Sequence, residues 1–152
     1  MIALDGSPTA ARAFECGSEL AAQLQASMAL VYVVDTRLLI AQESGVPGDR
    51  LKAEFEQMGH ETLRAAATRV RGVSEPWQFV PFGEPVREIL AAAREWRADL
   101  LVLGTHGRSG LARMLIGSTA EGVLRHATCP VLIVPAHDEL ASPPTRAQTV
   151  LP

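Results

Sequence analysis

The sequence is poor in several residue types, and each shortage argues against a class of protein. Among its 152 residues are only two cysteines, Cys16 and Cys129, and neither has a metal-ligand spacing. We therefore expect two reduced thiols rather than a disulfide framework or a zinc site. Lysine occurs once, as Lys52, and the net charge is -3. This balance gives no reason to expect a nucleic-acid or membrane partner.

Long apolar runs are also missing. No stretch approaches the roughly 20 apolar residues that a membrane helix needs. The first residues show no charged segment followed by a long apolar run, which would mark a signal peptide. We therefore expect a cytoplasmic protein. A hydrophobic fraction of 47% and a charged fraction of 20% are ordinary for a soluble domain.

Short apolar runs are present instead, and they alternate with helical patterns. The runs predict five strands, at about 1–4, 28–34, 77–82, 99–103 and 131–134. Amphipathic spacing between them predicts helices at about 8–26, 51–70, 85–96 and 118–127. The alternation predicts an α/β fold in which helices cross over between parallel strands. Pro81 places an irregularity, or a sheet edge, at the third strand.

The end of the chain differs in composition from the rest. Residues 136–152 contain Pro143, Pro144 and Pro152, few apolar anchors and no periodicity. We predict a single domain over residues 1–135 and a flexible tail over residues 136–152.

A glycine-rich segment, GTHGRSGLARMLIGST, follows the fourth predicted strand at residues 104–119. Open parallel sheets bind ligands beyond the carboxyl ends of their strands, so this position is informative. Gly104 lacks a Cβ and lets the backbone approach a ligand closely, while Gly107 and Gly110 favour positive φ. Gly117 opens a helix whose first N–H groups are unpaired and attract anions. The segment therefore indicates a phosphate site, to which Arg108 and Arg113 add positive charge.

Another interpretation of this segment, without a ligand, stays open. Ser118 and Glu121 have the spacing of a capping box, in which each side chain bonds the backbone of the other. The glycines then form only a mobile connection. The segment has no GxxxxGK[ST] loop, so it offers no lysine to a phosphate. It has no GxGxxG turn either, because its first three glycines are spaced by three.

The spaced glycines and their flanks resemble a known signature. Gly104-x2-Gly107-x9-Gly117-Ser118, within VLGTHGRSG and LIGSTAEGVLRHATCPVLIVP, is similar to the nucleotide-binding motif of the universal stress protein family, ATP-binding branch. The Asp5-Gly6-Ser7 turn and the VYVVD strand resemble the opening of that family. The likeness runs from Met1 to about Pro135, although the first strand has fewer preceding residues than the family normally has.

The resemblance implies a fold, an assembly and a site. It implies a Rossmann-like five-stranded parallel sheet of order 3-2-1-4-5, with helices on both faces, and a homodimer built through the last strand. It also implies a nucleotide site in which Asp5 lies near the ribose, the phosphates or their Mg²⁺, and the Val33 backbone meets the adenine beside Ala3. The remaining matching positions line the sugar and phosphates: Leu103, Gly104, His106, Gly107, Arg108, Gly117, Ser118 and Thr119.

Three functions remain compatible with the sequence. The favoured one is a regulatory stress-response homodimer that binds ATP with Mg²⁺ and reports its occupancy to an unidentified protein partner. The second is an enzyme, either a slow metal-dependent ATP hydrolase or an adenylate-transferring enzyme, although no general base is evident and the glycine segment has no lysine. The third is a structural dimer with a vestigial pocket. Asp5 has a simpler interpretation too, as a turn-forming residue before the first helix.

Overall fold

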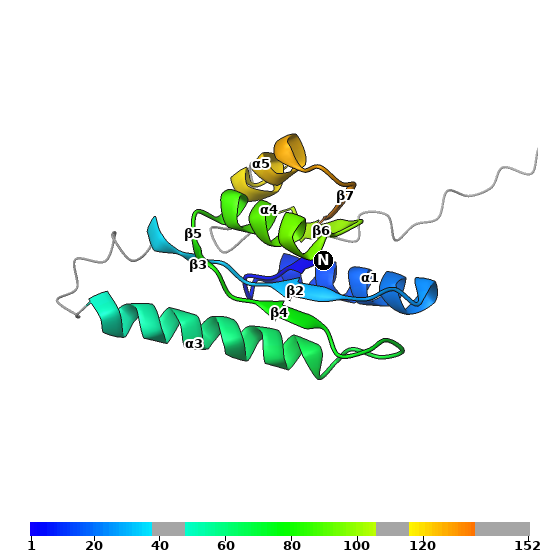
Figure 1. Ribbon diagram of the computed structural model, residues 1–152, viewed down its shortest axis with the longest axis horizontal. Helices are drawn as coiled ribbons and strands as arrows, with labels where there is room; N and C mark the ends of the chain where they lie inside the picture. The colour runs from blue at the N-terminus through cyan, green and yellow to red at the C-terminus, as the bar shows by residue number, and fades with distance from the viewer. Residues whose placement is uncertain (38–47, 106–115, 136–152) are drawn as a thin grey trace, which may run out of the picture.

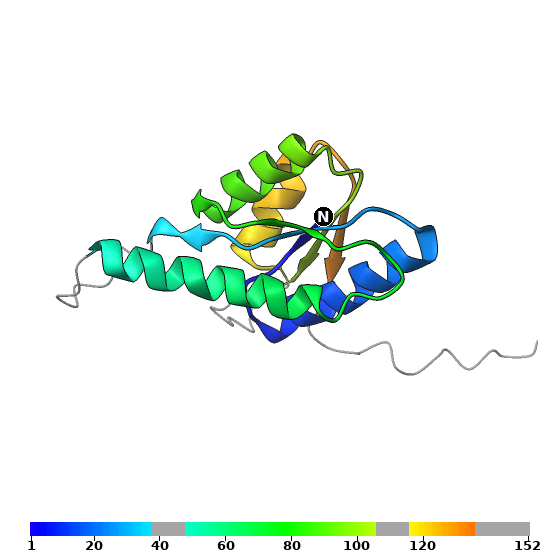
Figure 2. The ribbon, with the colours of Figure 1, turned by 60° about the horizontal axis from the view of Figure 1, so that its bottom comes forward.

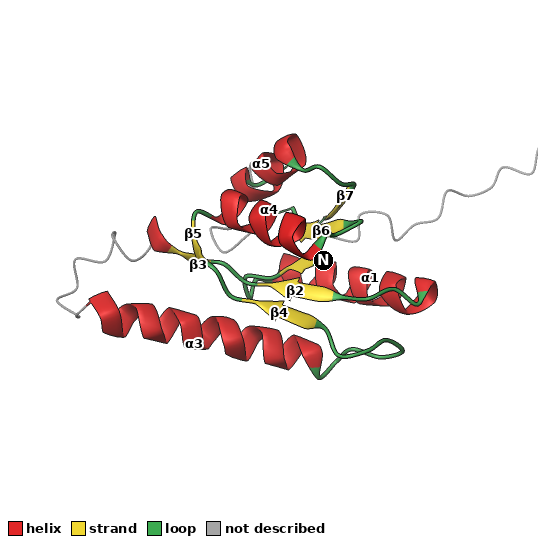
Figure 3. Cartoon of the chain, viewed as in Figure 1, coloured by secondary structure: helices red, strands yellow, loops and turns green. Residues whose placement is uncertain are grey.

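Five strands form one parallel sheet in the computed structural model, which describes residues 1–37, 48–105 and 116–135. The strands are β1 (Ile2–Ala3), β2 (Ala29–Val31), β4 (Trp77–Phe79), β6 (Leu101–Gly104) and β7 (Val131–Val134). They lie in the order β4-β2-β1-β6-β7, as Figure 3 shows. In chain order this is 3-2-1-4-5, so the predicted fold and strand order are confirmed.

Helices cover both faces of the sheet. They are α1 (Pro8–Leu24), α3 (Gly48–Ala67), α4 (Pro85–Trp96) and α5 (Ser118–His126). α1 and α3 pack on one face, and α4 and α5 pack on the other (Figures 1 and 2). Both faces of each central strand are therefore buried, which explains why these strands are continuously apolar in sequence.

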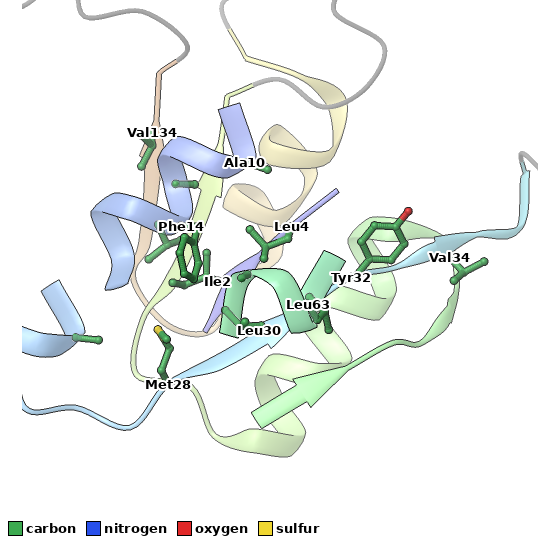
Figure 4. Packing of buried hydrophobic residues seen from close by; sticks show 14 residues of the cluster. Ile2, Leu4, Ala10, Phe14, Met28, Leu30, Tyr32, Val34, Leu63 and Val134 are labelled. Carbon is green, nitrogen blue, oxygen red and sulfur yellow. The ribbon is translucent and has the colours of Figure 1, made fainter. Parts of the chain in front are cut away.

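The core consists of two hydrophobic clusters separated by the sheet. Ile2, Phe14 and Leu63 belong to the cluster under α1 and α3, which Figure 4 shows from close by. Leu101 and Val123 belong to the cluster under α4 and α5. Successive strand residues point to opposite faces, so β1, β2, β6 and β7 each contribute side chains to both clusters.

The second and third predicted strands are each interrupted. After β2 and β4, a short two-stranded parallel ribbon follows, made of β3 (Val34–Asp35) and β5 (Phe82–Gly83). The break in the third strand falls at Val80 and Pro81, where the sequence predicted an irregularity. Proline has no N–H to donate, which weakens the ladder at this point.

Gly104 ends β6 against the first turn of α1. A Cβ at this position would lie 2.8 Å from the carbonyl carbon of Thr9 and 2.9 Å from its oxygen. From the sequence, we predicted that the missing Cβ of Gly104 permits close approach of a ligand. The structure gives a packing reason for this glycine, because strand and helix backbones come together here.

A buried serine caps helix α1. The Ser7 Oγ accepts a hydrogen bond from the Ala10 N–H at 3.2 Å and lies 3.0 Å from the Thr9 hydroxyl. Pro8 follows at the first helical position, as the sequence predicted.

Replacing Ser7 with alanine removes this cap and leaves the Ala10 N–H without its acceptor. We expect the free energy of unfolding to fall by about 1–2 kcal/mol, measured by urea denaturation. Ser18→Ala is the control, because the Ser18 hydroxyl bonds only the Glu15 carbonyl on the same helix. Equal losses in the two variants would contradict a specific capping role for Ser7.

Candidate functional site

The carboxyl ends of the central strands converge at one edge of the sheet. Ala3 pairs with Val31, and Ile2 pairs with Val102 on the other side of β1. Continuing this register places Leu103 beside Ala3, while Gly104 pairs with Val134. The strand order reverses between β1 and β6, and ligands of open α/β sheets bind at such a point.

Val33 presents backbone polar groups to this edge. The N–H groups of Tyr32 and Val34 both donate toward the β4–β5 side, to the carbonyls of Phe79 and Pro81, at 2.9 Å each. In extended backbone the intervening residue turns its N–H and C=O to the opposite side. Among the described residues no backbone bond engages Val33 there, since β1 has already ended. The Val33 N–H and C=O therefore offer one donor and one acceptor, which is the pair of groups that the polar edge of a planar heterocyclic ring can bond.

Asp5 forms the turn that joins β1 to α1. Its Oδ1 accepts a hydrogen bond from the Ser7 N–H at 2.9 Å, and Gly6 between them has a φ of 81°. The turn-forming interpretation of Asp5 therefore has a direct structural basis. Three or more His, Cys, Asp or Glu side chains that could hold a metal do not come together anywhere in the described ranges. Mg²⁺ needs no such cluster when phosphates supply most of its ligands, so one carboxylate at this edge fits it.

The N-terminus of α5 lies close to the end of β6. The Gly117 N–H donates to the Thr105 carbonyl at 2.6 Å, and Gly117 is the N-cap residue. The helix then begins at Ser118, which is exposed, and Thr119, which is half-buried. No side chain of the described residues caps this helix. The amides of its first turn are donors that suit an anion.

The capping-box interpretation of this helix is wrong. It required Ser118 as the N-cap and a hydrogen bond from its side chain to Glu121. Gly117 takes the N-cap position instead, and Glu121 forms an ion pair with Arg125 one turn later, at 2.8 Å. Charged pairs at this spacing stabilise a helix along its exposed side and leave the first turn open.

Part of the predicted site cannot be placed. His106, Gly107 and Arg108 lie outside the described residues, as do Gly110, Arg113 and the predicted tail at 136–152. The described members of the predicted site come from β1 (Ala3), the turn after it (Asp5), the segment after β2 (Val33), β6 (Leu103, Gly104) and the start of α5 (Gly117, Ser118, Thr119). Ala3, Val33 and Leu103 all belong to the hydrophobic cluster under α4 and α5.

Sequence reasoning missed Thr105, which connects two parts of this edge. Its N–H donates to the Val134 carbonyl at 2.9 Å, and its carbonyl accepts from Gly117 at 2.6 Å. The residue is buried, with 9% of its surface exposed. Both of these hydrogen bonds are made by backbone groups, so the identity of the Thr105 side chain gave no signal for this role.

An ion pair lies beyond the site, at the end of β3. The Arg37 guanidinium binds both carboxylate oxygens of Asp35, with Nε–Oδ1 at 2.9 Å and Nη2–Oδ2 at 2.7 Å. These hydrogen bonds hold the pKa of Asp35 below its ordinary value. A carboxylate kept ionised in this way is a poor candidate for a general acid.

This geometry defines a class: an α/β domain whose strand order reverses between β1 and β6, with the start of a helix beside the carboxyl ends of these strands. The family model of the universal stress protein family matches residues 1–135, and the chain belongs to that family.

Three similar proteins illustrate the relationship. The universal stress protein MJ0531 of Methanocaldococcus jannaschii is 32% identical over 139 residues, which cover 88% of this chain and 79% of the relative. A solved structure of a family protein from Burkholderia pseudomallei is 37% identical with a TM-score of 0.71, covering 88% and 92% of the two chains. A universal stress protein crystallised in complex with cAMP is 29% identical with a TM-score of 0.66, covering 88% and 93%.

Every helix in the described part of the chain is too short or too polar to cross a membrane.

Proposed function

We propose that this protein is a nucleotide-binding regulatory module that binds ATP, with Mg²⁺, at the carboxyl edge of its sheet. The observation that carries the proposal is that two sets of backbone groups, each without a hydrogen-bond partner among the described residues, lie at that edge. Val33 offers a donor and an acceptor at one end, and the uncapped first turn of α5 offers donors at the other. The first set suits an adenine, and the second suits phosphates.

Electrostatics and family membership support the same proposal. The positive end of the α5 dipole favours phosphate, and Asp5 supplies one carboxylate for a metal ion that phosphates would otherwise coordinate. The relative crystallised with cAMP carries an adenine nucleotide on the same fold. When bound, ATP and Mg²⁺ supply a charged, occupancy-dependent surface rather than a reaction that this chain's described residues carry out.

The proposed functional unit is a cytoplasmic homodimer. β7 is the last strand of the sheet, and its outer edge pairs with no other strand of the described residues. A free edge of this kind is suited to pairing with a second copy of the chain. The dimer would bring two nucleotide sites into one assembly, which a protein partner could recognise together.

Ser118→Pro tests the phosphate end of the site without disturbing the helix. Proline is favoured at the first helical position, and α1 and α4 of this chain both begin with proline. Gly117, with φ -71° and ψ 154°, already has the extended conformation that a following proline requires. The substitution deletes one amide donor, so we expect ATP affinity to fall about tenfold while the melting temperature of the unliganded protein changes little.

Titration calorimetry with ATP, AMP, cAMP and GTP measures this effect and the base preference together. Ser118→Ala is the matched control, because it removes the hydroxyl and keeps the amide. If Ser118→Pro binds ATP as tightly as the parent protein, phosphates do not reach this helix. If the parent protein binds none of the four nucleotides, the structural dimer with a vestigial pocket becomes the better account.

A further inference from the structure

A shallow groove of about 340 Å³ lies between the outer edge of β4 and helix α4, away from the proposed nucleotide site. Its strand side is Gln78–Pro81. Its helix side is formed by Glu88, Ala91, Ala92 and Glu95. β4 is the terminal strand of the sheet, on the opposite side from β7. The groove therefore combines a free strand edge with one face of a helix.

The strand side presents open backbone groups. The Trp77 N–H donates to Met28, and the Phe79 carbonyl accepts from Tyr32, so these two residues face inward toward β2. Gln78 and Val80 alternate with them and turn their N–H and C=O groups outward. No strand in the described part of the chain pairs with this outer side.

Pro81 does not blunt this edge. Its carbonyl accepts a hydrogen bond from the Val34 N–H at 2.9 Å, so Pro81 faces inward toward β3. The hydrogen-bond donor that proline lacks is therefore missing from the inner side of this strand and not from its outer side. By the same alternation, Phe82 turns its backbone N–H and C=O outward. The open edge therefore extends over Gln78, Val80 and Phe82.

The helix side combines small residues with negative charge. Ala91 and Ala92 leave room for a backbone, and Glu88 and Glu95 lie about 10 Å apart along α4, two turns of helix. No lysine or arginine lines the groove. Arg87 approaches Glu88 only at 3.8 Å, and its side chain is 83% exposed. The groove thus favours a partner with positive charge.

We propose that this groove binds an extended basic peptide segment of another protein, which adds to the sheet as a strand beside β4. Backbone hydrogen bonds to Gln78, Val80 and Phe82 supply affinity, as in other cases of strand addition. A strand rises about 3.3 Å per residue, so basic side chains on alternate positions recur about every 6.6 Å, and long arginine side chains span the remaining few ångströms to Glu88 and Glu95. This inference does not depend on nucleotide binding at the opposite part of the sheet.

The test uses a fluorescein-labelled ten-residue peptide that alternates arginine with valine, measured by fluorescence anisotropy against the full-length protein. We expect saturable binding that Glu95→Lys weakens at least tenfold. The control is Glu19→Lys, which makes the same charge change at an exposed position of α1, on the opposite face of the sheet. Equal weakening in both variants would show that net charge alone drives binding, and would overturn the proposal.

N-methylation separates strand addition from simple charge attraction. Two further peptides carry N-methyl groups, one on the arginine positions and the other on the valine positions. In an added strand only one of these two sets of N–H groups faces β4, so one peptide should lose binding at least tenfold and the other should keep it. Equal binding by both peptides would overturn strand addition. A parent protein that self-associates in sedimentation, and ceases to do so as Glu95→Lys, would instead assign the groove to a second copy of the chain.

Discussion

Gly104→Ala is expected to lower the free energy of unfolding by about 3 kcal/mol, without any ligand present. The added Cβ would lie 2.8–2.9 Å from the carbonyl carbon, Cβ and carbonyl oxygen of Thr9. Two of these three atoms are backbone, so no change of rotamer relieves the contact. β6 or the first turn of α1 must shift, and both belong to the centre of the fold.

Urea denaturation measures this loss as a lower midpoint with an unchanged slope. Gly17→Ala is the comparison, because its added Cβ would meet the terminal Cδ1 of Ile2 at 2.7 Å. That contact is with a side-chain end, and alanine in place of glycine also favours the helix by about 1 kcal/mol. We expect Gly17→Ala to cost clearly less than Gly104→Ala. The opposite order would contradict the close approach of β6 to α1.

Ser118→Glu is expected to weaken ATP binding about a hundredfold while leaving the unliganded protein at least as stable. A carboxylate in the first turn of α5 interacts favourably with the helix dipole. The same carboxylate would repel phosphate groups held by that turn. Two like charges about 4 Å apart repel by about 1 kcal/mol in water and about 4 kcal/mol near a protein surface. A value midway in this range corresponds to roughly two powers of ten in affinity.

Titration calorimetry of ATP measures the affinity, and thermal unfolding without ligand measures the stability. Ser118→Gln is the matched control, because it has nearly the same size and no charge. The repulsion account requires the glutamine variant to bind far better than the glutamate variant. Comparable ATP affinities in the two variants would show that the phosphates do not bind at the start of α5.

The fold could be predicted from the sequence because its signals are local and repeated. Apolar runs of strand length alternate with amphipathic stretches, and Pro8 and Pro85 mark the first residues of two helices. The interruption after β2 could not be predicted in the same way. Residues 28–34 read as one continuous apolar run, and nothing in their composition distinguishes Tyr32 and Val33 from their neighbours.

The candidate site was predictable in outline and not in detail. The predicted start of α5 at Ser118 is confirmed, since the glycine before it stands out in sequence. Gly104 stands out in sequence as a glycine, but its contact with Thr9, distant along the chain, could not be predicted. The hydrogen bonds of Thr105 are made by backbone groups, so its side-chain identity gave no sign of them. Ser118 and Glu121 have the spacing of a capping box, but Arg125 lies one turn further and competes for the glutamate.

The peptide units around Thr105 tie two elements of the domain to one another. Its amide holds the last residue of the outermost strand, β7, and its carbonyl holds the residue that precedes α5. In the proposed homodimer, Thr105 would therefore connect the start of α5, where phosphates are proposed to bind, with the strand edge that faces a second copy of the chain. Nucleotide binding and dimer formation, both proposals for this chain, would then act on the same two backbone hydrogen bonds.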